Sequence, residues 1–115
     1  MAEPTIYIVD EVTTKPGKAR TFIDRYLAEY ALGAEGRGMT LDRVLVSPPI
    51  WFTDDNNTVT ISWTVPGVGA WWQMTAMGRH DAGIGAWWAE IDELLENRTR
   101  RMTAAAADVE GLSNV

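Results

Sequence analysis

Apolar and polar residues first follow a strand pattern and then a helical one. Residues 6–12 (Ile-Tyr-Ile-Val-Asp-Glu-Val) are mostly β-branched or apolar, which predicts a strand. Residues 13–17 then predict a helix start, with a hydroxyl residue as the cap and Pro16 in the first turn. From Lys18 to about Ala34 the apolar residues fall on one helical face. They are Ala19, Phe22, Ile23, Tyr26, Leu27, Tyr30 and Ala31.

The middle of the chain predicts two more strands joined by a hairpin. The first covers about Thr40 to Ser47, and Pro48-Pro49 ends or bends it because proline cannot continue a central ladder. Residues 51–53 (Trp-Phe-Thr) are expected to resume the strand before a turn at residues 54–57. From Thr58 to Val65 apolar and polar residues alternate, which predicts a strand with one strongly apolar face. That face carries Val59, Ile61, Trp63 and Val65.

The last third of the chain predicts two helices and leaves its end ambiguous. After a Pro-Gly break, a short helix is expected from Ala70 to about Gly78. Asp81 is suited to cap a second helix, whose apolar face continues to about Arg98. For residues 100–107 the alanine run favours helix, whereas the order of elements favours a final strand.

The element order β-α-β-β-α-β is that of a ferredoxin-like fold. The sequence therefore predicts one α+β domain over residues 1–115, with a four-stranded antiparallel sheet and helices on one of its faces. The opposite face would be half polar, which favours a homodimer in which a second sheet covers it. The residues expected on that face are Tyr7, Val9, Glu11, Thr58, Thr60 and Ser62.

Composition excludes several classes of function. The chain has no cysteine, so it has no disulfide, thiolate nucleophile or cysteine-bound metal. Its net charge of −6 argues against nucleic-acid or anionic-membrane partners, which need a positive surface. No apolar run reaches the roughly 20 residues of a membrane span, and the N-terminal residues do not resemble a signal peptide. We therefore expect a cytoplasmic protein without nucleic-acid or membrane partners.

Asp10 is a candidate catalytic base because it shares its strand face with Ile6, Ile8 and Val12. A carboxylate on that face is either desolvated, which raises its pKa and suits a base, or paired with a cation. Arg43 or Arg79 is the expected partner in the second case.

His80 is the only histidine, so any histidine chemistry must use it. It is compatible with general acid/base catalysis or, in principle, with haem ligation, but its loop setting also fits a surface residue. Metal sites that need two histidines are excluded, and no carboxylate spacing typical of a metal site is present. We therefore expect no metal and no cofactor.

Six tryptophans are more than a core of this size requires. They predict either plain core packing or an aromatic wall around a flat or hydrophobic ligand. Trp51 is expected at the pocket mouth or at a dimer contact. The candidate substrate-binding residues are Trp51, Trp63, Trp72, Trp87, Trp88, Phe22, Tyr30 and Arg43.

Five features spread along the chain form a further pattern. They are residues 6–8 (Ile-Tyr-Ile), residues 14–18 (Thr-Lys-Pro-Gly-Lys), the hairpin turn at 54–58, Arg79 before a tryptophan-bearing helix, and residues 100–102 (Arg-Arg-Met). Together they resemble NIPSNAP-type members of the dimeric α+β barrel superfamily. The resemblance implies two sheets that close into a barrel across a dimer, with a pocket between sheet and helices. It also implies wide functional range, from cofactor-free oxygenases to isomerases, lyases and haem enzymes, so it does not choose a reaction. Bacterial relatives often have a basic residue where this chain has Asp10.

Two functions follow from these residues. The first is a cofactor-independent isomerase, lyase or monooxygenase that acts on a hydrophobic cyclic or aromatic carbonyl compound. In it Asp10 removes a proton, His80 or Tyr26 returns one, and Arg79 or a tryptophan N–H holds the enolate oxygen. The second is a non-catalytic ligand-binding or scaffold dimer. A tight arginine partner for Asp10 would favour the second function. The arginine group at 98, 100 and 101 is expected in solvent or at an interface, where it could receive a ligand carboxylate.

Overall fold

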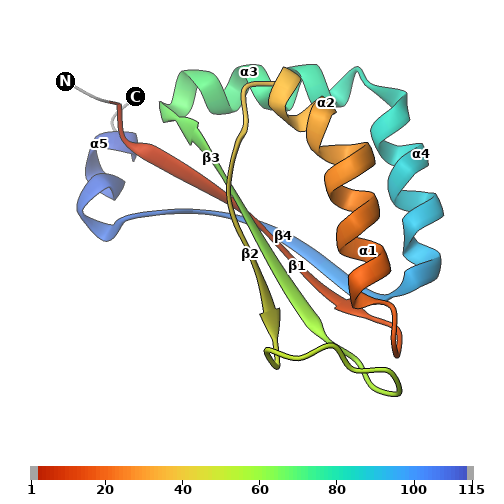
Figure 1. The fold of residues 1–115 in the computed structure, drawn as a ribbon. Helices are drawn as coiled ribbons and strands as arrows, with labels where there is room; N and C mark the ends of the chain where they lie inside the picture. Colours follow the sequence, from red (N-terminus) through yellow and green to blue (C-terminus); the bar gives the residue numbers. More distant parts are fainter. Residues whose placement is uncertain (1–2, 114–115) are drawn as a thin grey trace.

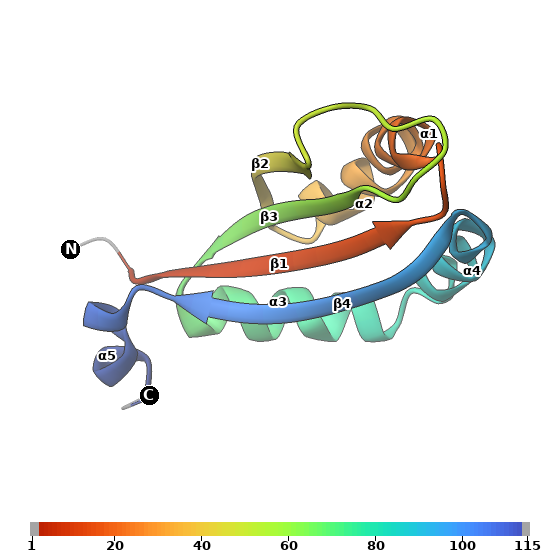
Figure 2. The same cartoon turned by 90° about the horizontal axis from the view of Figure 1, so that it is seen from below.

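Four antiparallel strands and a layer of helices make up the fold in a computed structural model that describes residues 3–113. The sheet order is β2-β3-β1-β4, with β1 (Thr5–Thr14), β2 (Thr40–Ser47), β3 (Thr58–Pro66) and β4 (Leu95–Ala104). The principal helices are α1 (Ala19–Arg25), η1 (Tyr26–Tyr30), α2 (Ala31–Gly36), α3 (Gly67–Arg79) and α4 (Ala82–Ile91). These helices lie on one side of the sheet (Figures 1 and 2). The predicted α+β, ferredoxin-like architecture is confirmed.

Alternation along the central strands separates the two faces of the sheet as predicted. Ile8, Asp10 and Val12 on β1 face the helices and are buried, and they pair in register with Trp63, Ile61 and Val59 of β3. The neighbouring residues of both strands point to the opposite face, which no helix of residues 3–113 covers (Figure 2). The core therefore lies between the sheet and a single helical layer.

The helical run over residues 19–36 contains a wide π-helical turn at η1. The N–H of Ala31 donates to the carbonyl of Tyr26, five residues back, which marks the turn. Buried residues recur every four positions here, at Phe22, Tyr26, Tyr30 and Ala34. Because four exceeds the 3.6 residues of an ideal turn, one wider turn keeps them on the same side. Tyr26 and Tyr30 thus lie side by side with ring centroids 4.9 Å apart.

The helix start differs from the prediction. Lys18 precedes α1 without a side-chain cap, and Pro16 lies in the preceding turn rather than in the helix. Gly17 in that turn has a φ of 73°, and a Cβ there would lie 2.5 Å from the carbonyl oxygen of Thr53. The close approach of this backbone therefore requires glycine.

The structure tests three further predictions, which concern the cap of α4, the end of α4 and the last element of the sheet. Asp81 does cap α4, since its carboxylate accepts from the N–H of Gly83 at 2.9 Å. The prediction that α4 continues to Arg98 is wrong, because the helix ends at Ile91 and the final strand begins at Leu95. That strand resolves the open choice between helix and strand.

Residues 51–53 do not resume a strand, and that prediction is wrong. They belong to a loop whose backbone is hydrogen-bonded to the buried side chain of Asn57. The Asn57 amide nitrogen donates to the carbonyls of Ser47, Pro48 and Ile50, and its oxygen accepts from the N–H of Phe52. These bonds satisfy the loop backbone, so it does not need a sheet partner.

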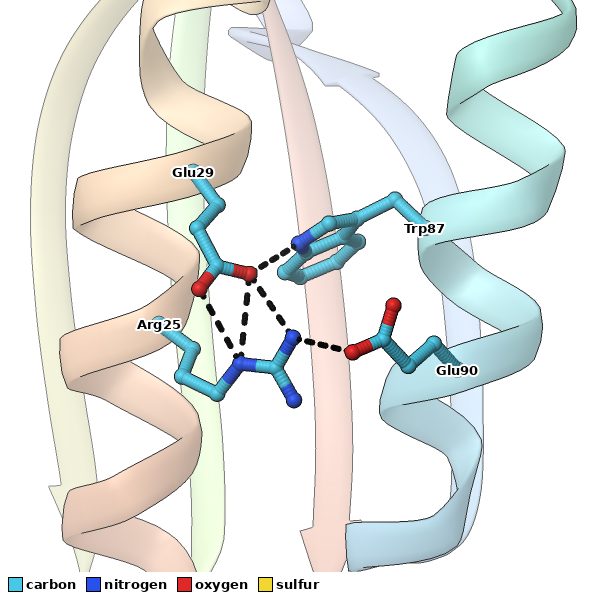
Figure 3. Close-up of polar contacts among 4 residues, drawn as sticks. All are labelled: Arg25, Glu29, Trp87 and Glu90. Atoms are coloured by element: carbon cyan, nitrogen blue, oxygen red, sulfur yellow. Dashed lines mark hydrogen bonds and ion pairs between the residues drawn. The ribbon is translucent and has the colours of Figure 1, made fainter.

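A surface network ties the first helical run to α4 (Figure 3). Arg25 donates to Glu29 one turn later and to Glu90 of α4, at 2.9 and 2.8 Å. The indole N–H of Trp87 donates to the same Glu29 at 2.8 Å. Hydrogen bonds to its carboxylate lower the pKa of Glu29, with the larger effect from Arg25 and the smaller from Trp87. The network thus links the two helices at the protein surface.

Among the helices of the described residues, none has the length and apolar character that crossing a bilayer requires.

Candidate functional site

Asp10 lies at the centre of a buried hydrogen-bond network. Asp10 is 2% exposed, and its partner is Arg100, which lies opposite it on β4 and has a partly exposed side chain. The guanidinium donates twice, from Nε to Oδ1 at 2.6 Å and from Nη2 to Oδ2 at 2.8 Å. The expected pairing of Asp10 with Arg43 or Arg79 is therefore wrong, because neighbouring strands place Arg100 in register. A carboxylate with both oxygens held in this way is poorly suited to remove a proton from a substrate.

Tyr26 and Trp63 extend the network into the core. The Tyr26 hydroxyl donates to Oδ2 of Asp10 at 2.9 Å and accepts from the indole N–H of Trp63 at 2.6 Å. Burial, together with the charge of Asp10, raises the pKa of Tyr26 far above its usual value. Tyr26 therefore stays protonated and anchors Asp10.

Arg100 connects this anchor to Tyr30. Its Nη2 also donates to the Tyr30 hydroxyl, at 2.8 Å. Burial alone would lower the pKa of Arg100, but hydrogen bonding and Coulombic attraction to Asp10 outweigh it, and the pKa is raised. A second guanidinium, from Arg37, donates to the same hydroxyl at 3.3 Å. Both cations also lie near the Tyr30 ring, 5.5 Å from its centroid for Arg37 and 5.9 Å for Arg100.

Arg37, Arg100 and Tyr30 line one end of a cavity of about 320 Å³ between the sheet and α3. The rest of the lining is mostly apolar and comes from β1, α3, α4 and β4. It consists of Ile8, Trp71, Met74, Thr75, Gly78, Ile84 and Met102. The cavity is thus amphipathic, with two guanidinium groups and a phenol at one end only.

Arg37 is a buried cation without a carboxylate partner among residues 3–113. It is 8% exposed, and its guanidinium donates to the Tyr30 hydroxyl and lies over the Tyr30 ring. Its Nε lies 3.9 Å from where a Cβ on Gly78 would stand, so the C-terminal turn of α3 is close. A helix C-terminus carries only about half a negative charge and offsets the guanidinium in part. Charged residues are almost never buried unless they are paired, so this site favours an anion.

Aromatic rings fill the neighbouring space rather than enclosing a hollow. Tyr26 lies 4.9–6.2 Å, centroid to centroid, from each of five other rings. These are Phe22, Tyr30, Trp63, Trp87 and Trp88. The N–H groups of Trp63 and Trp87 are used by Tyr26 and Glu29, so neither is free to hold a ligand oxygen. Of this cluster, Tyr30 lines the amphipathic cavity, and Trp88 lines a smaller hollow of about 150 Å³ beside Asp10 and Arg98.

The remaining sequence-predicted residues lie away from the cavity. Arg79 and His80 are exposed at the end of α3, and Arg43 is exposed on β2, where it contacts Asp42. Trp51 lies on the loop with Arg20 over its ring. Trp72 is 57% exposed, because α3 turns its neighbour Trp71 toward the sheet instead.

Three solved structures resemble this chain over nearly its whole length. A NIPSNAP domain protein from Burkholderia xenovorans, described as uncharacterized, aligns with a TM-score of 0.66 at 17% identity, covering 89% of this chain and 95% of that chain. A NIPSNAP family protein from Agrobacterium tumefaciens gives a TM-score of 0.67 at 15% identity, with coverage of 92% and 90%. A second from the same organism, described as of unknown function, gives 0.68 at 12% identity, with coverage of 92% and 95%. The chain has the NIPSNAP fold.

The likeness to NIPSNAP proteins is visible in structure and not in sequence searches. No family model matches the chain, and no curated protein matches it. The resemblance found in the residues is confirmed for the fold. Within this NIPSNAP fold, the position of Asp10 on the central strand β1 is what brings Arg100 to the site.

Sequence reasoning missed most of the cavity in this NIPSNAP fold. Arg37 follows the last turn of α2, where its only signal was a basic residue among glycines. Met74 and Met102 had no distinguishing pattern either. The tryptophan pair at 71 and 72 did give a signal, but Trp72 was predicted to bind substrate and Trp71 lines the cavity instead. Arg100 belongs to the arginine group expected in solvent or at an interface and able to receive a carboxylate, and its side chain is partly exposed while it also lines the cavity.

Proposed function

We propose that this protein binds a small hydrophobic monoanion, such as a carboxylate, in the amphipathic cavity. The observation that carries the proposal is Arg37, a buried guanidinium that faces the cavity and has no carboxylate partner among the described residues. A bound anion would supply the missing charge. Small-molecule sites commonly combine apolar walls with a few convergent polar groups, and this cavity has that composition.

The charges at the polar end support a ligand with a single negative charge. Asp10 neutralises the charge of Arg100 through two short hydrogen bonds. Arg37 contributes a positive charge that is not paired with any carboxylate of residues 3–113. The cavity volume of about 320 Å³ is at the low end of the range of about 300–1,000 Å³ for ligand sites. A ligand with one acidic group and a modest apolar body matches both properties.

Tyr30 supplies a neutral donor beside the two cations. Its hydroxyl oxygen accepts from Arg37 and Arg100, so its own proton is directed elsewhere. A ligand oxygen in the cavity is a suitable acceptor for that proton. The three groups together would therefore hold both oxygens of a carboxylate.

The proposal is tested by titrating the protein with octanoate and with the neutral analogue octanol, using calorimetry. We expect octanoate to bind more tightly, and we expect Arg37→Met to weaken octanoate binding by about 30-fold or more, since truncating one partner of a buried charge pair costs about 2–5 kcal/mol. Octanol affinity should change little. Unfolding free energy should be unchanged or raised, because the substitution removes a desolvated cation.

Arg20→Met is the matched control, because Arg20 is exposed on α1 and faces Trp51. It removes the same charge and should leave octanoate affinity unchanged. If Arg37→Met lowers stability but not affinity, Arg37 serves the fold alone and the binding proposal fails.

A second candidate function is proton transfer at the carbon next to a carbonyl group. The Tyr30 hydroxyl favours it, because its hydrogen is available to donate to a ligand oxygen. The same donors that hold a carboxylate would stabilise an enolate oxygen. The described cavity lining contains no carboxylate or imidazole in a position to act as the base, so binding is the better-supported function. Incorporation of deuterium from D2O into a bound carbonyl compound would be the mark of this activity.

We also propose that two copies associate through the uncovered sheet face. Leu45 is exposed there beside Thr60, on the same side as Val9. Leu45→Asp should weaken association at least tenfold in sedimentation equilibrium, because it places a charge in an apolar contact. Leu32→Asp, exposed on α2, is the control and should have no effect. A wild-type chain that sediments as a monomer would refute the dimer.

A further inference from the structure

A second apolar hollow continues the amphipathic cavity beyond Trp71 and Met102. Its volume is about 330 Å³, and the two hollows share these two side chains as a common wall. The second hollow is otherwise lined mainly by apolar residues from β1, α3, β4 and α5 (Val109–Ser113). They include Ile6, Val68, Ala104 and Leu112.

Strand pairing places the two hollows in line. On the helix-facing side of the sheet, the paired residues run from Asp10 with Arg100, through Ile8 with Met102, to Ile6 with Ala104. At about 3.3 Å per residue, the four steps from Arg100 to Ala104 span about 13 Å. The facing wall is α3, where Gly78 lines the first hollow and Val68 lines the second. At about 1.5 Å per residue, those positions are about 15 Å apart, so the two walls agree in length.

The charged groups are confined to one end of this path. Arg37 and Arg100 line the first hollow together with Tyr30, whereas no charged residue of the described chain lines the second, whose lining is apolar apart from Thr103. A compact aromatic acid would occupy the first hollow and leave the second uncovered. A linear molecule with one anionic end would cover both.

We propose that the ligand is a straight-chain alkyl carboxylate, a deduction that rests on the proposed function. Its head group binds Arg37 and Tyr30, and its tail passes between Trp71 and Met102 into the second hollow. The unbranched thioether of Met102 adapts its shape to such a chain. With C–C bonds of about 1.5 Å, an extended chain advances about 1.3 Å per carbon, so the path accommodates about ten carbons.

A series of fatty acids of increasing chain length tests the proposal on the intact 115-residue chain. Calorimetric titration with hexanoate, octanoate, decanoate and tetradecanoate, each below its micellar concentration, should show affinity rising about threefold to fourfold per methylene. The rise should stop near ten carbons, where the second hollow ends. Affinity that is already constant from hexanoate onward would overturn the tail path while leaving anion binding intact. Failure of every member to bind would refute the proposed function itself.

A blocking variant separates the two hollows. Ala104 lines the second hollow and not the first, so Ala104→Phe should weaken decanoate binding at least tenfold and leave hexanoate unchanged. Val68→Phe fills the same hollow from α3 and should have the same effect if Ala104→Phe does not fold. Ala86→Phe, exposed on α4, is the matched control. Equal losses for both ligands, or no loss for decanoate in a folded variant, would refute the tail path.

Discussion

Replacing Arg100 with leucine is expected to lower the free energy of unfolding by about 2–3 kcal/mol, less than for a fully buried ion pair because the Arg100 side chain is 39% exposed. The reason is Asp10, which is 2% exposed and would keep only the Tyr26 hydroxyl as a partner. Removing the arginine leaves the charge of the buried Asp10 uncompensated, which costs more than the ion pair itself contributes. Urea denaturation monitored by circular dichroism measures the loss.

Two variants define the cause of that loss. Arg98→Leu removes an arginine from the same strand, but its ion pair with Asp92 is exposed and should contribute less than about 1 kcal/mol. The double variant Asp10→Asn, Arg100→Leu should be more stable than Arg100→Leu alone, since the uncompensated charge is gone. A loss for Arg100→Leu no larger than that for Arg98→Leu would mean that water solvates Asp10 after the substitution.

Trp63→Ala should destabilise the protein by about 3–5 kcal/mol, the usual cost of truncating a buried aromatic residue to alanine. The indole is fully buried on β3 and packs against Tyr26, and its N–H donates to that hydroxyl. The substitution leaves a cavity and also loses this hydrogen bond. Chemical denaturation at two wavelengths would report both the loss and any departure from two-state unfolding.

Trp72→Ala is the control for this prediction, because it removes an indole that is 57% exposed. We expect a change within about 0.5 kcal/mol, as for most surface substitutions. Similar losses for both variants would contradict the assignment of Trp63 to the core.

Periodicity in the sequence predicted the sheet because burial enforces it. From Thr58 to Val65 each apolar side chain faces the helices, and a shift of one residue would turn the whole set into solvent. The final strand lacked this signal. From Leu95 onward β4 is largely polar, as befits an edge strand, and its pairing with β1 overrides the helical spacing that ends in Leu94 and Leu95.

The cavity could not be predicted in the same way. Arg37 follows α2 and Arg100 lies on β4, and they meet because both donate to the Tyr30 hydroxyl. The tryptophans were consistent with core packing or with an aromatic wall. In the structure Trp87 and Trp88 pack on each other, and among the tryptophans only Trp71 lines the cavity of the described residues, together with Met74 and Met102. Side-chain packing across three elements decides this outcome, and no local pattern records it.

The wide turn at η1 has a consequence for comparing this chain with its relatives. A π-helical turn holds one more residue than an α-turn, so it behaves as a single-residue insertion that the flanking helices absorb. A relative with a regular helix here would lack one position between Tyr26 and Tyr30, and its two side chains would be three residues apart. An alignment gap placed inside residues 26–30 would then keep both ends of the helix in phase, whereas a gap placed in the following loop would shift Tyr30 and Arg37 out of register.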